Sequence, residues 1–117
     1  MDKVFRNRIK ALSLFANVGV AESYLHDVGV DVVVANELIE KRARFYRHLY
    51  PEVNMITGDI TDAEIYNEII IKARYEGVDF ILATPPCQGM SCAGRKDPQD
   101  PRNSLIFYAI KAIKDLK

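Results

Sequence analysis

Short apolar runs alternate with longer amphipathic stretches along this chain, and this alternation limits the possible folds more than any other feature. The short runs are β-branched or aromatic, end in turn or polar residues, and predict strands at 10–15, 31–36, 54–59 and 79–84. The stretches at 20–29, 38–50, 62–77 and 104–117 predict helices. Strands that alternate with helices of this length form right-handed crossovers. We therefore expect an α/β fold, with a parallel sheet and helices on both faces.

The helix predictions depend on apolar residues at helical spacing and on glycines that stop the helix. In the stretch at 38–50, the apolar residues at helical spacing are Phe45 and Leu49. In the stretch at 62–77, they are Ile65, Ile69 and Ala73. Gly29 and Gly77 are placed to end two of the helices. No strand follows the last predicted helix, so we expect the parallel sheet to be incomplete.

Length and charge set outer limits on the function. A chain of 117 residues with 49% hydrophobic content suits one small domain with a real core. Sixteen basic and sixteen acidic residues balance, so the net charge does not indicate a nucleic-acid partner. The basic cluster at 41–47 is interpreted as a solvated helix face. No apolar stretch approaches the roughly 20 residues of a membrane span and the amino terminus lacks a signal-peptide core, so we expect no membrane association and a cytoplasmic protein.

Candidate site residues follow each predicted strand. In a parallel α/β sheet, a ligand binds beyond the carboxyl ends of the strands, near the point where strand order reverses. After the first strand, "FANVG" at 15–19 makes a tight turn into a helix amino terminus. Glu37 follows the second strand about 20 residues on, where an acidic side chain commonly binds a ribose. Asp59 ends the third strand and Cys87 stands just beyond the fourth.

Each of these features has a simpler interpretation that stays open. A turn with one glycine is common without any nucleotide site. Glu37 also suits a charge near a helix amino terminus. Asp59 also suits a turn residue, with Thr61 or Asp62 capping the next helix. Their joint placement at successive strand ends favours the ligand site.

The two cysteines are not expected to form a disulfide or a metal site. Cys87 and Cys92 are the only cysteines, and in a reducing compartment two thiols this close are better interpreted as reactive or packed. No third or fourth soft ligand is present to build a zinc site, so we expect no metal. Cys92 is interpreted as a small side chain in a loop. The position of Cys87 after two prolines, at a strand end, indicates a thiol that faces a cleft.

Five segments together resemble the ordered motifs of the cytosine-5 DNA methyltransferase family. They are "LSLFANVG" at 12–19, "NE" at 36–37, "GDI" at 58–60, "PPCQGMS" at 85–91 and "DPRNSL" at 100–105. The resemblance implies a Rossmann-like, S-adenosylmethionine-dependent methyltransferase fold. It also implies cofactor contacts: for the methionine part Phe15, Asn17 and Gly19; for the ribose Glu37; for the adenine Leu38, Asp59 and Ile60; and, completing the pocket, Pro86 and Leu105.

The resemblance makes Cys87 the catalytic nucleophile. Its thiolate would add to C6 of cytosine, which makes C5 reactive enough to accept a methyl group. The partner would be duplex DNA with a flipped cytosine, enclosed by the loop at 88–102. Within that loop the expected DNA contacts are Gln88, Ser91, Arg95 and Arg102. A plain surface connection is the alternative interpretation of this loop.

The chain departs from the family pattern in two ways. Asn17 and Val20 stand where relatives usually carry glycine; Asn tolerates positive φ well, whereas Val20 is expected to crowd the cofactor. Motifs that follow in the family, including the target-recognition region, are absent. We therefore expect residues 1–117 to be the amino-terminal part of the catalytic domain, either a fragment or half of a split enzyme with a complementary carboxy-terminal polypeptide.

Three functions remain open at this point. The leading one is a DNA cytosine-5 methyltransferase, of the bacterial restriction-modification type. A tRNA-methylating branch of the same family carries a similar Pro-Pro-Cys-Gln element, so tRNA is an alternative substrate. The third is a cofactor-binding subunit without turnover of its own.

Overall fold

A computed structural model describes residues 7–85 and 105–117, and in these ranges the predicted alternation of strands and helices is present. The elements in chain order are β1 (Ile9–Leu14), α1 (Val20–Asp27), β2 (Val30–Glu37), α2 (Glu40–Leu49), β3 (Asn54–Thr57), α3 (Ala63–Glu76), β4 (Phe80–Ala83) and α4 (Leu105–Asp115). Within the described part of the chain, no helix combines the length and the apolar character needed to cross a membrane.

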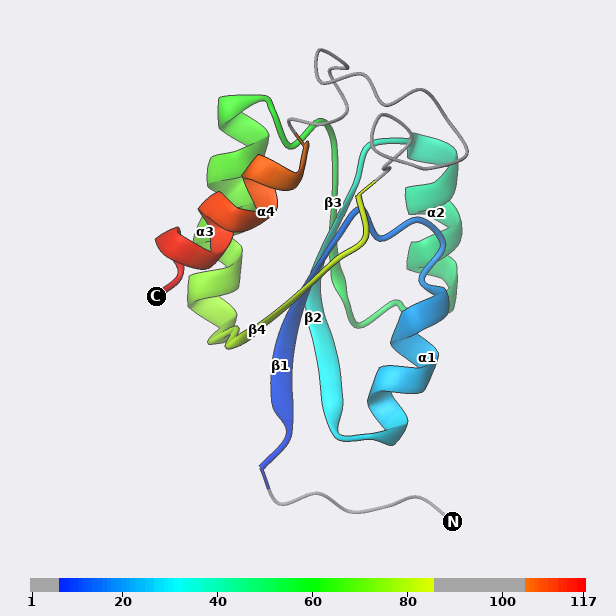
Figure 1. Ribbon diagram of the computed structural model, residues 1–117. Coiled ribbons are helices and arrows are strands. Elements are labelled where there is room, and N and C mark those ends of the chain that lie inside the picture. The colour runs from blue at the N-terminus through cyan, green and yellow to red at the C-terminus, as the bar shows by residue number, and fades with distance from the viewer. Residues whose placement is uncertain (1–6, 86–104) are drawn as a thin grey trace, which may run out of the picture.

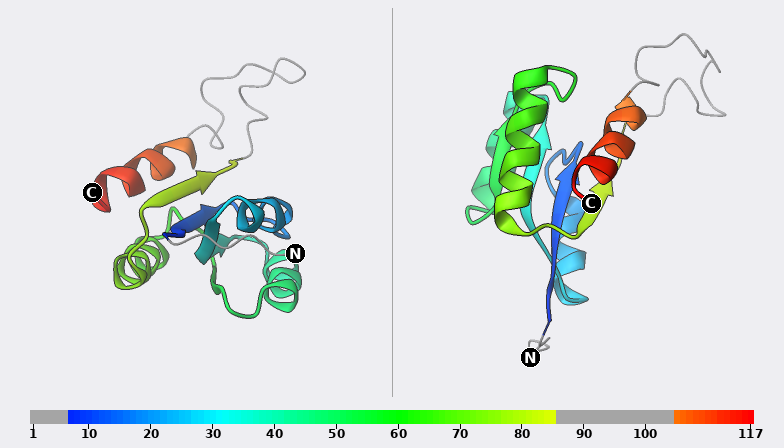
Figure 2. Two further views of the ribbon diagram at one scale, coloured as in Figure 1. Left: turned by 90° about the horizontal axis from the view of Figure 1, so that it is seen from below. Right: turned by 90° about the vertical axis from the view of Figure 1, so that its left-hand side faces the viewer.

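The four strands form one parallel sheet in the order β3-β2-β1-β4. The chain moves outward from β1 through β2 to β3 and then returns to place β4 on the other side of β1. Strand order therefore reverses beside β1, and the carboxyl ends of β1 and its neighbours meet at one edge. Helices α1 and α2 cover one face of the sheet, and α3 and α4 cover the other (Figures 1 and 2). This confirms the predicted fold class.

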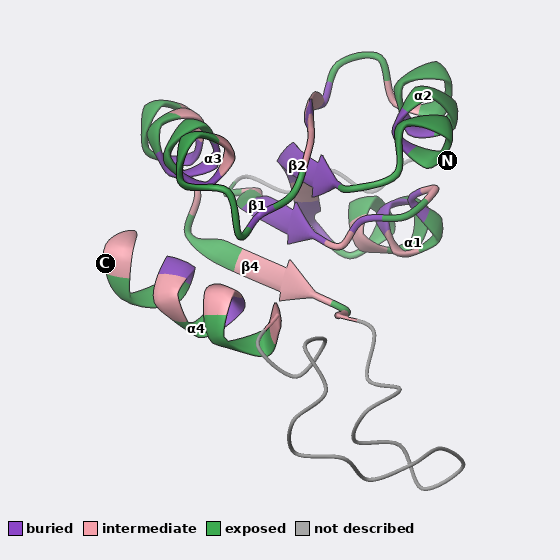
Figure 3. Cartoon of the chain, turned by 90° about the horizontal axis from the view of Figure 1, so that it is seen from above, coloured by how far each residue is buried: buried purple, intermediate pink, exposed green. Residues whose placement is uncertain are grey.

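The sheet separates two hydrophobic layers (Figure 3). The α3/α4 face buries large aliphatic side chains of the strands, such as Leu12, Leu14 and Ile56, against Ile69 and Ile70 of α3. The α1/α2 face buries smaller side chains, among them Ala11, Ala35 and Val32, together with the ring of Tyr46. The two sets come from successive residues of the same strands because side chains alternate between faces.

A register shift in β2 interrupts this alternation next to the site. Ala11 pairs with Val32 but Leu12 pairs with Val34, so Val33 is an extra residue between the two pairs. Such a bulge bends the strand and re-aims the side chains that follow it. Val32 and Val34 consequently belong to opposite layers although they are two residues apart.

Helix ends follow the predicted signals, with one correction to a buried face. Asp62 caps α3 by accepting a hydrogen bond from the backbone N–H of Glu64 (2.9 Å), and Gly77 ends α3 at φ 74°. The side chains of Phe45 and Leu49 are exposed, and α2 buries Ala43 and Tyr46 instead. The helical spacing was right, but it did not identify the buried face, because Ala43 and Tyr46 are the side chains that fit against the small residues of the sheet.

Candidate cofactor-binding site

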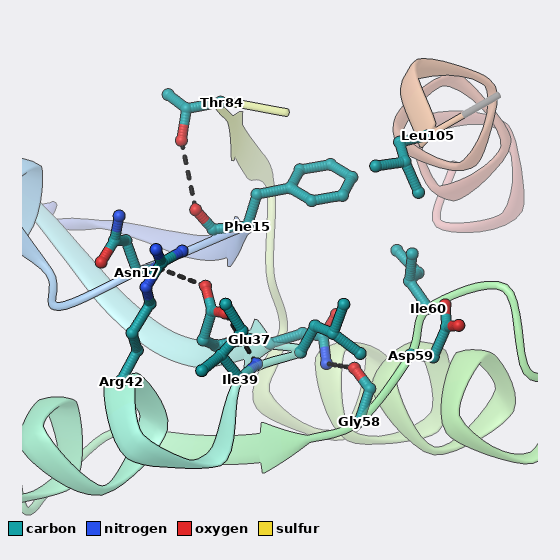
Figure 4. Close-up of a pocket in the computed structure, with 12 residues that line it drawn as sticks. Phe15, Asn17, Glu37, Ile39, Arg42, Gly58, Asp59, Ile60, Thr84 and Leu105 are labelled. Atoms are coloured by element: carbon teal, nitrogen blue, oxygen red, sulfur yellow. Dashed lines mark hydrogen bonds between the residues drawn. The ribbon is translucent and has the colours of Figure 1, made fainter. Parts of the chain in front are cut away.

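A pocket of about 320 Å³ opens at the carboxyl ends of the strands (Figure 4). The predicted cofactor residues that line it are Phe15, Asn17, Glu37, Leu38, Asp59, Ile60 and Leu105. The other lining residues are Asn36, Ile39, Arg42, Gly58 and Thr84. Residues at the ends of the strands, together with Leu105 at the start of α4, which is 90 positions after Phe15 in the chain, therefore meet in one cavity at the reversal of strand order. Its volume lies within the range of small-molecule sites.

The turn between β1 and α1 forms one wall of the pocket. Phe15 and Asn17 adopt positive φ angles of 58° and 55°, and Gly19 follows at 82°. Positive φ is uncommon outside glycine and is a strained conformation for an aromatic residue such as Phe15. The neighbouring strands hold the turn in place: the Ala16 N–H donates to the Asn36 carbonyl (3.0 Å), and the Thr84 hydroxyl donates to the Phe15 carbonyl (3.3 Å).

Glu37 connects this turn to the end of β2. Its side chain is buried, and its two carboxylate oxygens each accept one backbone N–H, Oε1 from Asn17 and Oε2 from Ile39, both at 2.8 Å. These bonds fix the carboxylate at the rim of the pocket. A carboxylate oxygen has more than one acceptor position, so both oxygens retain capacity for a hydroxyl donor from a ligand.

Asn36 joins the ends of β2 and β3. Its buried side-chain amide donates to the carbonyls of Ile56 (2.8 Å) and Gly58 (3.0 Å). Gly58 in turn donates its N–H to the Glu37 carbonyl (3.0 Å). A Cβ at Gly58 would lie 2.6 Å from Cδ1 of Ile65, so the close approach of this turn to α3 requires glycine. Asn36 is thus a positioning residue of the pocket that the motif match named without giving it a role.

Asp59 serves in the turn that the alternative interpretation predicted, and it also lines the pocket. Its Oδ1 accepts hydrogen bonds from the backbone N–H (2.9 Å) and the hydroxyl (2.7 Å) of Thr61. No hydrogen bond from the described residues engages Oδ2. The two interpretations of Asp59 are therefore compatible, because each uses a different oxygen.

The pocket has an apolar end and a polar end. Ile60, Leu105 and Phe15 face the cavity at one end, with Asp59 beside them, whereas Asn17 and Arg42 lie at the other (Figure 4). The Glu37 carboxylate lies between the two ends. Such a lining can hold a flat apolar ring, a hydroxylated group and a charged tail in sequence.

Gly19 and Val20 are not among the residues that line this pocket. Gly19 packs towards α2: the Tyr50 hydroxyl donates to the Gly19 carbonyl (2.6 Å), and a Cβ at Gly19 would lie 2.5 Å from Cε2 of Tyr50. The cofactor role of Gly19 stays a prediction. Val20 has an exposed side chain and does not line the pocket. Crowding of the cofactor by Val20 stays a prediction.

Arg42 is the lining residue that the sequence interpretation placed elsewhere. It belongs to the basic cluster on α2, which was interpreted as a solvated face, yet it contributes to the pocket. Ile39 and Thr84 also carried no motif signal. A signal for Arg42 was available in principle, because residues in the first turn of the helix after β2 lie near the carboxyl edge of the sheet.

Several predicted residues lie outside the described part of the chain. They are Pro86, Cys87, Gln88, Ser91, Arg95 and Arg102. Their predicted roles, including the catalytic role of Cys87, stay predictions.

Comparison with known families agrees with the motif pattern. The model of the C-5 cytosine-specific DNA methylase family matches residues 9–117. The chain belongs to this family. The fold is accordingly the Rossmann-like fold of S-adenosylmethionine-dependent methyltransferases, which confirms the prediction.

Three family relatives illustrate the similarity. The chain is 47% identical to the type II methyltransferase M1.HgaI of Avibacterium volantium, over 96% of the chain and 33% of that protein. It is 29% identical to the tRNA (cytosine(38)-C(5))-methyltransferase of Spodoptera frugiperda, over 92% of the chain and 32% of that protein. A crystal structure of a putative DNA modification methyltransferase from an Escherichia coli prophage matches with a TM-score of 0.66 and 25% identity, over 92% of the chain and 29% of that protein. The chain thus spans about a third of the length of these relatives.

Proposed function

We propose that this chain is the cofactor-binding, amino-terminal part of a DNA cytosine-5 methyltransferase, which transfers a methyl group from S-adenosylmethionine to C5 of cytosine. One observation carries the proposal: in a member of this family, the residues matching the cofactor motifs after β1, β2 and β3 line a single pocket. The type II methyltransferase similar over nearly the whole chain favours DNA as the substrate.

The lining of the pocket fits S-adenosylmethionine group by group. Leu38, Ile60 and Leu105 offer apolar contacts to the adenine, and Oδ2 of Asp59 is available to its exocyclic amine. The Glu37 carboxylate, held by two backbone N–H groups, would accept hydrogen bonds from the ribose hydroxyls. When bound, the cofactor supplies an electrophilic methyl group.

Cys87 is the proposed nucleophile. Its thiolate Sγ would form a bond to C6 of cytosine, which shifts electron density to C5 so that C5 can take the methyl group. A base then removes the C5 proton, and the Sγ–C6 bond breaks to release the methylated base and the thiolate. Pro85 and Pro86 restrict the backbone just before Cys87, because proline fixes φ.

The DNA contacts belong to the same proposal. C6 is hidden in stacked duplex DNA, so the cytosine must be flipped out of the helix before Sγ can reach it. The residues proposed to contact the flipped base and the DNA are Gln88, Ser91, Arg95 and Arg102. Because the chain matches about a third of its relatives, we propose that base-sequence recognition resides in a further region or in a complementary polypeptide. A DNA substrate in a bacterial restriction-modification system would place the enzyme in the cytoplasm.

The test is transfer of a labelled methyl group from S-adenosylmethionine to mixed-sequence duplex DNA. The full-length protein is compared with Cys87→Ser, and Cys92→Ser is the matched control. We expect transfer to DNA by the wild type and by Cys92→Ser, and none by Cys87→Ser, which lacks the thiolate. Equal activity of Cys87→Ser would contradict the assignment of the nucleophile.

The same assay with tRNA tests the second candidate. The similarity to a tRNA (cytosine(38)-C(5))-methyltransferase keeps this substrate open. Transfer to tRNA with none to DNA would replace the leading proposal and retain the chemistry of Cys87. Cofactor binding without transfer to either substrate, with the complementary polypeptide present, would identify a cofactor-binding subunit instead.

A further inference from the structure

Arg42 is a cationic residue at the polar end of the pocket. It lies in the first turn of α2 and lines the cavity together with Asn17 and Glu37. Its side chain rises from α2 towards Asn17, away from the end formed by Ile60 and Leu105 (Figure 4). Among the residues lining the pocket, the only charged side chains are those of Glu37, Asp59 and Arg42.

The guanidinium of Arg42 has no ion-pair or hydrogen-bond partner among the described residues. The nearby acceptor, Glu37, already binds two backbone N–H groups. Arg47, on the same helix, is engaged: it donates to the Thr57 hydroxyl (2.6 Å) and pairs with Glu40 (3.6 Å). Arg42 therefore brings unused donors and a positive charge to the cavity.

The order of groups in the cofactor indicates what Arg42 would meet. This step depends on the proposed function. With adenine at the apolar end and the ribose at Glu37, the amino-acid part of the cofactor must extend past Glu37 towards Asn17 and Arg42. That part ends in a carboxylate, and a guanidinium binds a carboxylate through charge-assisted hydrogen bonds.

We propose that Arg42 binds the methionine carboxylate of S-adenosylmethionine and sets the selectivity of the pocket for ligands that carry this group. Asn17 offers an amide beside the same position. The adenine and ribose parts are held independently of Arg42, by the residues of the apolar end and by Glu37.

The experiment measures equilibrium binding by calorimetry for the full-length protein and three variants. The probes are S-adenosylmethionine, S-adenosylhomocysteine and 5′-methylthioadenosine, which lacks the amino-acid carboxylate. The variants are Arg42→Ala, Arg42→Lys and the control Arg44→Ala, which alters an exposed arginine of the same helix outside the pocket. Because Arg42 is exposed, its replacement should leave the fold intact, which thermal unfolding verifies.

For Arg42→Ala we expect about a tenfold loss of affinity for the two ligands that carry the carboxylate, since a charge-assisted hydrogen bond is lost. Binding of 5′-methylthioadenosine should stay within about twofold of wild type. Arg42→Lys should recover part of the loss, because it keeps the charge but not the planar fork of donors. Arg44→Ala should match the wild type.

Three results would overturn the inference. An equal loss for 5′-methylthioadenosine would mean that Arg42 acts on the ribose or on Glu37. Unchanged cofactor affinity, with weaker binding of duplex DNA measured as a fourth probe, would assign Arg42 to a DNA phosphate. Unchanged binding of every ligand would remove any role in recognition. If the wild type binds none of the three probes, the proposed function itself fails, and this outcome differs from all of those above.

Discussion

Against α3 and α4 the sheet buries large aliphatic side chains, whereas against α1 and α2 it buries small and polar ones. The first layer contains Leu12, Leu14 and Ile69, all inaccessible to solvent. The second contains Ala11 and Ala35, with Ser13, Glu22 and Tyr46 buried beside them. Large aliphatic burial contributes most of the hydrophobic free energy of folding, so the α3/α4 face should supply more stability per residue.

The polar groups of the α1/α2 face are incompletely satisfied. Oε2 of Glu22 and the hydroxyl of Tyr46 are both buried without a hydrogen bond of good geometry within the described structure. Burial raises the pKa of the Glu22 carboxyl, and the nearby hydroxyls of Tyr46 and Ser13 offset part of that rise. Burial, with the carboxyl of Glu22 beside it, also raises the pKa of the Tyr46 phenol.

The two faces of the sheet therefore differ in what they contribute to the molecule. The β1–α1 turn, with Gly19 pressed against Tyr50, is supported from the α1/α2 face. That face contains poorly satisfied polar groups where it supports the turn, whereas the α3/α4 face buries mainly large aliphatic side chains. Substitutions at Ile69, Gly19, Glu22 and Asp31, most of them with a matched variant, test this difference between the two faces.

The largest effect is expected on the α3/α4 face, from Ile69→Ala. Ile69 is fully buried, so its truncation leaves a cavity and should lower the free energy of unfolding by about 2 to 5 kcal/mol. The control is Ile71→Ala on the same helix, where the side chain is 66% exposed and the change should stay below about 0.5 kcal/mol. Chemical denaturation measures both. Equal effects would contradict the assignment of this face as the main source of stability.

The second test compares two glycines with similar backbone. Gly19 and Gly77 have φ angles of 82° and 74°. A Cβ at Gly19 would clash with the side chains of Tyr50 and Tyr46, whereas a Cβ at Gly77 would have no atom within 4 Å. Gly77→Ala should cost about 1 kcal/mol from backbone strain alone. Gly19→Ala should cost about 2 to 4 kcal/mol, because overpacking adds to the strain. If denaturation gives the same loss for both, the close approach at Gly19 is not a constraint.

The third test concerns the pH dependence of the α1/α2 face. The pKa of Glu22 in the folded protein lies above its ordinary value of 4.5, so between these two values the folded state binds more protons than the unfolded chain. Stability should therefore fall as pH rises from about 4.5 through the folded pKa. Glu22→Gln stays neutral and should abolish that fall, while the exposed Glu68→Gln should retain it. If the stability of the wild type depends on pH in the same way as that of Glu22→Gln, folding does not raise the pKa of Glu22.

The smallest effect, with the opposite sign, is expected at the surface. The hydrogen bond from Arg8 (2.6 Å), with His26 (2.9 Å) as a second partner, lowers the pKa of Asp31 from its ordinary value of 3.8. This contribution is present above pH 3.8 and is lost as pH falls through the folded pKa. Because the pair is partly exposed, Asp31→Asn should lower the melting temperature by a few degrees at most at neutral pH. A loss as large as that of Ile69→Ala would contradict this ranking.

Much of the fold and part of the site could be predicted from the sequence, because the relevant signals lie in short segments of the chain. Apolar periodicity located every strand and helix of the described ranges, and the stop signal at Gly77 ended α3 at the predicted place. Strand-end placement and motif order identified Phe15, Glu37 and Asp59 before their meeting in one pocket was known. These signals are local because they depend only on neighbours along the chain and on the rule that parallel strands share one carboxyl edge.

Other features arose only from tertiary packing. The exposed positions of Phe45 and Leu49 and the burial of Tyr46 depend on which side chains the sheet presents to α2. Arg42 looked like one member of a solvated cluster, and only the position of α2 against the strand ends brings it into the pocket.

The sequence on its own predicted the parallel α/β fold, the family and the order of the residues that line the candidate cofactor-binding pocket. Only the tertiary structure shows which way the side chains of these residues point relative to the pocket. The extra residue Val33 in β2 changes which side of the sheet each later residue points to, so that Asn36 reaches β3 while Glu37 reaches the β1–α1 turn. Side chains on a strand alternate with a period of two, so a single inserted residue reverses every position after it. No pattern within the strand alone records that reversal, because it is defined by the pairing with β1.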